Sequence, residues 1–105
     1  MAVREATYQR RVIDRLKYEF PGCVVLKNDS SILQGVPDLL VIYEDRWAML
    51  EVKASERSRT QPNQEYYVDL FNRMSYAAFI FPENEDEVFR DLQHALSPSW
   101  AARLP

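Results

Sequence analysis

The sequence contains a single cysteine, a single histidine and no long apolar run. Because Cys23 has no second cysteine to pair with, an intramolecular disulfide framework is excluded, and with His94 as the only other soft ligand so is a structural zinc site of cysteine and histidine. No stretch approaches the roughly 20 apolar residues that cross a bilayer, so we expect no membrane span. The N-terminal stretch 1–11 is too polar for the apolar part of a signal peptide, and we expect a cytoplasmic protein.

The composition is that of an ordinary globular protein. Hydrophobic residues make up 47% and charged residues 28% of the 105 residues, a length that suits one domain over 1–105. The formal net charge of −3 is uneven: residues 1–60 carry ten basic and nine acidic side chains, whereas 61–105 carry three and seven. Nucleic-acid binders usually carry a basic patch, so this acidity counts mildly against such a partner. It does not decide the question, because carboxylates that hold a cation add negative charge for a separate reason.

The hydrophobic pattern predicts an α/β fold. Helical periodicity over 2–20 ends at Pro21-Gly22, and the polar stretch 27–37 is typical of an exposed loop. The predicted strands are 23–26, 38–43, 47–52 and 77–81, and the later helices are 62–74 and 84–96. We expect a mixed sheet of about four strands flanked by helices, with both faces of the hairpin formed by the second and third strands covered.

Three ionisable side chains lie at the ends of the two hairpin strands. Asp38 begins one strand, and Glu51 and Lys53, which alternation places on one face with Val52 on the other, end its partner. A short loop brings Asp38 beside this pair. All three share a face if the loop has two or four residues, whereas a three-residue loop without a bulge turns Asp38 away. The predicted strands are separated by residues 44–46.

Two neighbouring carboxylates repel one another, and their burial without compensation is costly. A divalent cation resolves this, and carboxylate oxygens suit Mg²⁺ or Mn²⁺, which bind phosphate oxygens in their remaining positions. Lys53 can then neutralise charge in the transition state or steer the attacking water. The pattern predicts phosphodiester hydrolysis. The alternative is that Asp38 merely ends a loop beside an ordinary ion pair of Glu51 and Lys53, but the convergence of all three favours catalysis.

Further polar side chains flank the predicted site on loops. Charge and hydroxyl donors make them candidates for contacts to phosphate groups, with a solvated surface position as the alternative for each. They are Lys27, Ser30, Ser31, Arg57 and Arg59.

Val36-Pro37-Asp38, followed after twelve residues by Glu51-Val52-Lys53, resembles the PD-(D/E)XK nuclease signature. The predicted order of helices and strands is similar to that family's restriction-endonuclease-like core. Over residues 5–96 the chain most resembles the Holliday-junction-resolvase and virus-type replication-repair nuclease (VRR-NUC) group, whose members are often phage-encoded and would then act in the host cytoplasm. The resemblance implies a Mg²⁺-dependent endonuclease without an organic cofactor. It would act as a homodimer on branched DNA, resolving four-way junctions and leaving 5′-phosphate and 3′-hydroxyl ends.

The resemblance also implies roles for residues outside the motif. Glu5 would be a further metal ligand, with Glu19 as the competing candidate, and the Val52 carbonyl would be another. Gln64, or else Gln61, would position water or phosphate. A nuclease acting on flaps, nicks or single strands would use the same residues, and a DNA-binding module that has lost cleavage is the remaining alternative. The chain departs from junction resolvases in its net acidity, since they tend to be basic.

Overall fold

The computed structural model describes residues 4–98 and contains a mixed four-stranded sheet with three α-helices. In chain order the elements are α1 (Glu5–Glu19), β1 (Val24–Lys27), β2 (Leu39–Tyr43), β3 (Arg46–Val52), α2 (Pro62–Met74), β4 (Tyr76–Ile80), a 3₁₀ turn (Pro82–Asn84) and α3 (Glu85–Ala95). The predicted α/β class and the order of helices and strands are confirmed. No described helix combines the length and apolarity needed to span a membrane.

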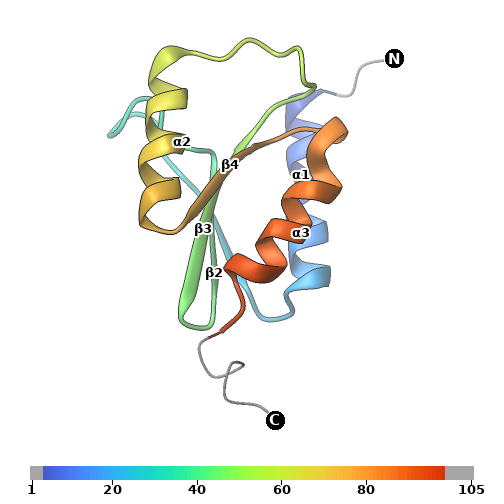
Figure 1. Cartoon of the computed structure of the whole chain (residues 1–105). Coiled ribbons are helices and arrows are strands. Elements are labelled where there is room, and N and C mark those ends of the chain that lie inside the picture. Colours follow the sequence, from blue (N-terminus) through green and yellow to red (C-terminus); the bar gives the residue numbers. More distant parts are fainter. Residues whose placement is uncertain (1–3, 99–105) are drawn as a thin grey trace.

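The strands lie in the order β1-β2-β3-β4, and of the three neighbouring pairs the last is parallel. The first three strands form an antiparallel meander, and α2 is the crossover that brings β4 alongside β3 in the same direction. Figure 1 shows α1 and α3 together on one side of the sheet and α2 on the other. One face of the sheet is therefore covered by two helices and the other by one.

The hydrophobic core lies between the sheet and the pair α1 and α3. The inward face of α1 contributes Tyr8, Val12 and Leu16, which recur at helical spacing and are at most 2% exposed. Because alternate residues of β2 and β3 are held on this face, the intervening residues point to the α2 face. The other core members are Phe20, Leu39, Val41, Ala48, Leu50, Val52, Ile80, Val88, Phe89, Leu92 and Leu96.

The loop between β2 and β3 is shorter than the sequence suggested. Arg46 belongs to β3 and pairs with Tyr43, so only Glu44 and Asp45 form the loop. Glu44 has a φ of 55°, the left-handed conformation that primed two-residue hairpin turns require at their first central position. The two-residue loop sets the register of the whole hairpin.

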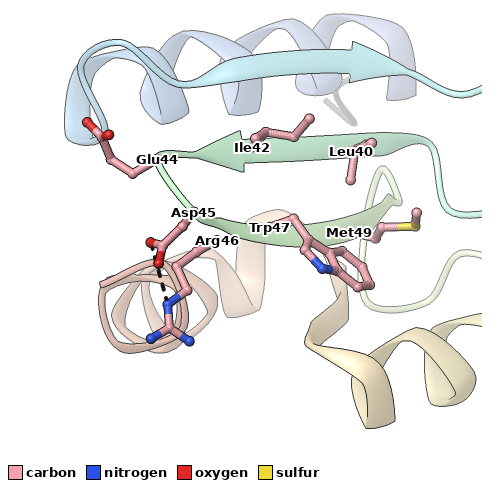
Figure 2. A pocket seen from close by; sticks show the side chains of 7 residues that line it. All are labelled: Leu40, Ile42, Glu44, Asp45, Arg46, Trp47 and Met49. Carbon is pink, nitrogen blue, oxygen red and sulfur yellow. Dashed lines mark ion pairs between the residues drawn. The ribbon is translucent and has the colours of Figure 1, made fainter. Parts of the chain in front are cut away.

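The face that carries α2 is only partly covered, contrary to the expectation that helices shield both sides of the hairpin. A helix is about 10 Å wide and strands lie about 4.8 Å apart, so one helix covers about two strands. α2 lies over β3 and β4, and Val24 and Leu26 on β1 are 50% and 48% exposed. Beside them the hairpin forms an open hollow of about 480 Å³, shown in Figure 2, with the apolar lining residues Leu40, Ile42, Trp47 and Met49.

Candidate functional site

Asp38, Glu51 and Lys53 meet at the end of the β2–β3 hairpin. Leu39 pairs with Leu50, so Asp38 opposes Glu51, which is the register in which the two carboxylates share a face. Strand alternation places Lys53 on this same face, the one that carries α2. The predicted convergence is confirmed, and the shorter hairpin loop is the reason that it holds.

The backbone of both neighbouring strands holds Asp38 in place. The Asn28 N–H donates to the Asp38 carbonyl at 2.8 Å, and the Val52 N–H donates to Asp38 Oδ2 at 2.8 Å. The N–H and C=O of one strand residue point to the same neighbouring strand. The Val52 carbonyl therefore faces the same edge of β3 as the Asp38 carboxylate, and its role as a metal ligand stays a prediction.

The loop that precedes Asp38 is attached to the start of α2. Gly35 has a φ of 95°, a left-handed conformation that favours glycine, and a Cβ added there would lie 2.8 Å from Asn63 Cγ. The Asn63 side-chain amide also donates to the Gln34 carbonyl at 3.3 Å. This close approach connects the loop carrying Asp38 to the helix that carries Gln64.

Glu51 and Lys53 are buried, with exposed fractions of 2% and 8%, and are bridged by Gln64. Lys53 Nζ lies 3.7 Å from Glu51 Oε2 and donates to Gln64 Oε1 at 2.9 Å and to the Arg59 carbonyl at 3.2 Å. Gln64 Nε2 in turn donates to Glu51 Oε2 at 3.1 Å. Gln64 is thus brought into the site, whereas the alternative, Gln61, is exposed at the N-terminus of α2 and its N–H donates to Gln64 Oε1 at 3.0 Å.

The electrostatics of Glu51 are strongly perturbed. Its pKa is raised from 4.5 to about 8, first by burial and next by the charge of Asp38, with a smaller contribution from Glu5, while Lys53 opposes the rise. Within residues 4–98, the buried Glu51 Oε1 has no hydrogen-bond partner. An unsatisfied buried polar atom costs roughly 1–3 kcal/mol, and a cation here would relieve both that cost and the repulsion between the carboxylates.

Glu5 lies at the start of α1 and is exposed, although its charge contributes to the raised pKa of Glu51. It is not drawn in with Asp38 and Glu51: over the described residues, no three acidic, histidine or cysteine side chains gather closely enough to hold a metal ion. Its role as a ligand stays a prediction. Glu19, the competing candidate, lies at the other end of α1 and pairs with Arg15 at 2.6 Å.

The candidates for phosphate contact are all exposed. Lys27 ends β1 opposite the residue that follows Asp38. Ser30 and Ser31 lie in the loop between β1 and β2, and Arg57 and Arg59 lie between β3 and α2. Their contacts to phosphate stay predictions.

Two basic residues that the sequence reasoning did not single out are Arg10 and Lys17. Together with Lys27 they line a hollow between α1 and β1. Their separation of seven residues, about two helical turns, was a signal that they share one face of the helix. Their proximity to Lys27 depends on how α1 packs on the sheet.

Comparisons of the chain with models of protein families, with curated proteins and with solved structures gave no match. Its function is therefore inferred from the residues and their geometry.

Proposed function

We propose that this protein is a metal-dependent DNA endonuclease of the PD-(D/E)XK type, with a restriction-endonuclease-like core, that hydrolyses phosphodiester bonds in branched DNA. The observation that carries the proposal is the Glu51 carboxylate: it is buried, opposes Asp38, has one oxygen without a described partner and lies 3.7 Å from the Lys53 ammonium. A buried ion pair is often no more stable than an apolar pair of the same shape. A second carboxylate beside it makes a purely structural role more costly still.

The donor set suits Mg²⁺, for which Mn²⁺ can substitute. Mg²⁺ keeps several waters and usually takes one or two carboxylates together with phosphate oxygens, so Asp38 and Glu51 are enough without a third. The unpartnered Glu51 Oε1 is an available ligand atom. The Val52 carbonyl and Glu5 are the further oxygen donors that we assign to this end of the sheet. When bound, the ion would polarise the scissile phosphate and stabilise the charge that develops on it.

Lys53 and Gln64 supply the remaining chemistry. The Lys53 ammonium is buried, so little water screens its charge from a phosphate at the site. It orients the attacking water and neutralises negative charge on the phosphorus oxygens in the transition state. Gln64 bonds both Lys53 and Glu51 and thereby holds their relative position. In-line attack of water on phosphorus breaks the bond to the 3′ oxygen, which leaves with a proton, so the products end in 5′-phosphate and 3′-hydroxyl.

A homodimer would carry two such sites and could cut a four-way junction symmetrically. The open sheet face supports this part of the proposal. Val24 and Leu26 are about half exposed, and they adjoin the apolar hollow of Figure 2 across the β1–β2 pairing. Contiguous exposed apolar surface is typical of interaction sites. We assign this face to contact with a second copy of the chain.

Cleavage of labelled four-way junctions, flaps, nicked duplexes and single strands in Mg²⁺, Mn²⁺ or EDTA tests the proposal. The protein should cut only with a metal, and junctions fastest. Asp38→Asn and Lys53→Ala should each lower the rate by about 100-fold or more. The matched changes Asp69→Asn and Arg73→Ala, at exposed positions of α2, should leave it unchanged.

Variants that cut as fast as the parent, or a lack of metal-dependent cutting on every substrate, would contradict the assignment. Faster cutting of flaps or single strands would retain the chemistry but replace the junction as the substrate.

A further inference from the structure

The hollow between α1 and β1 carries an excess of positive charge. Its volume is about 480 Å³, and its lining residues are Ala6, Gln9, Arg10, Ile13, Asp14, Lys17 and Lys27. Three of the four charged groups are cations, although the whole chain has a net charge of −3. All four are exposed, and within residues 4–98 none of them takes part in an ion pair.

The contrast with Arg15 on the same helix is informative. Arg15 lies 2.6 Å from Glu19, 2.6 Å from Glu85 and 2.8 Å from Asp86, so its charge is neutralised by acidic side chains of α1 and α3. In the hollow, Asp14 is the only acidic lining residue. The three cations there are available to an anionic partner.

The hollow lies along α1, on the sheet face opposite to the side chains of Asp38, Glu51 and Lys53, and its Lys27 lies at the same end of the sheet as the candidate site. Lys27 pairs with Leu39, the residue after Asp38, and the start of α1 is close enough for Glu5 to raise the pKa of Glu51. Arg10 and Lys17 are separated by about 10 Å along the helix axis, at about 1.5 Å per residue. A strand of duplex DNA carries one phosphate per about 3.4 Å of its axis, so the separation between Arg10 and Lys17 spans about three phosphates of one strand.

We propose that this hollow binds the phosphate backbone of a DNA strand that leaves the catalytic site, with Arg10, Lys17 and Lys27 each contacting a phosphate. The inference rests on the proposed function, because it names the path of that substrate over the protein. Contacts of this kind depend on charge. They hold the DNA strand in place but do not recognise its base sequence. They give an acidic protein a local basic track for DNA.

The salt dependence of DNA binding tests this path. Fluorescence anisotropy of a labelled four-way junction, in EDTA to prevent cleavage, is measured over a range of salt concentrations. The triple variant Arg10→Ala, Lys17→Ala, Lys27→Ala should bind more weakly than wild type. Its slope of log affinity against log salt should be shallower by up to about 2.7, since each phosphate contact contributes about 0.9.

The control removes the same charge elsewhere. Arg11, Arg73 and Arg90 are exposed on the three helices and do not line the hollow, so replacing all three by Ala should leave the slope within about 0.5 of wild type. Circular dichroism melting establishes that both triple variants fold. If the alanine variant of the hollow has a lower melting temperature than wild type, a variant with Gln at the same three positions is used in its place.

Equal slopes for the two triple variants, or a wild-type slope near zero, would overturn the inference. Its failure is distinguishable from failure of the nuclease proposal. Salt-dependent DNA binding through the hollow, without cleavage in the presence of any metal, would support the proposed path of the DNA strand and refute the proposed nuclease activity. Metal-dependent cleavage, together with an unchanged DNA affinity of the hollow variant, would support the nuclease activity and refute the proposed path.

Discussion

Replacing Glu51 by Gln should stabilise the metal-free protein above neutral pH. The pKa of Glu51 is raised from 4.5 to about 8, mainly by burial and next by the charge of Asp38. Across this range the folded protein retains a proton that the unfolded chain releases. The free energy of unfolding is therefore highest below about pH 4.5, falls as the pH rises, and levels off above about pH 8.

The size of the effect follows from the shift. One pKa unit corresponds to about 1.4 kcal/mol, so a rise from 4.5 to about 8 sets a ceiling of about 5 kcal/mol. Lys53 lies 3.7 Å from Glu51 Oε2 and opposes the rise in the pKa of Glu51, so we expect about half of this ceiling. The free energy of unfolding of the wild type should fall by about 2–3 kcal/mol between pH 5 and pH 8.5, and that of Glu51→Gln by less than about 1 kcal/mol.

Urea unfolding in EDTA at a series of pH values measures both proteins. His94→Gln is introduced as a common background, so that neither protein contains an imidazole. Glu65→Gln, at an exposed position on α2, is the matched control. Adding Mg²⁺ should stabilise the wild type more at pH 8.5 than at pH 6, because the ion displaces the proton, and should affect Glu51→Gln little. A wild-type stability that is constant or rises over this range, or a Gln variant less stable than the parent at pH 8.5, would refute the reasoning.

Three further predictions concern positioning, packing and assembly. Gln64→Ala removes the bridge between both members of the buried ion pair and should slow cleavage about 10- to 100-fold without abolishing it, as measured on a labelled junction. Leu50→Ala, at a fully buried position, should lower the free energy of unfolding in urea by about 2–5 kcal/mol, whereas Met74→Ala, 63% exposed, should change it by less than about 0.5 kcal/mol. Leu26→Lys on the open sheet face should convert a dimer into a monomer in light scattering, and Tyr18→Lys on α1 should not.

Much of the fold could be predicted because its signals are local. The helical spacing that ends at Pro21-Gly22 identified α1, and apolar runs bounded by polar stretches identified the four strands. The convergence of Asp38, Glu51 and Lys53 was also predictable, since strand alternation and a short hairpin loop leave few possible registers. The function assigned to them stays a proposal.

The sequence by itself determined the helices, the strands and which acidic and basic side chains end the hairpin, because these depend on periodicity and chain order. Only the tertiary structure decided that Arg46 of β3 pairs with Tyr43 of β2, that one face of β1 and β2 stays open, and that Gln64 bridges Glu51 and Lys53. It also gathered the three cations of the hollow from a helix and a strand. These features depend on how helices and strands pack against one another. The residue pattern within one helix or strand does not predict where the neighbouring element will lie.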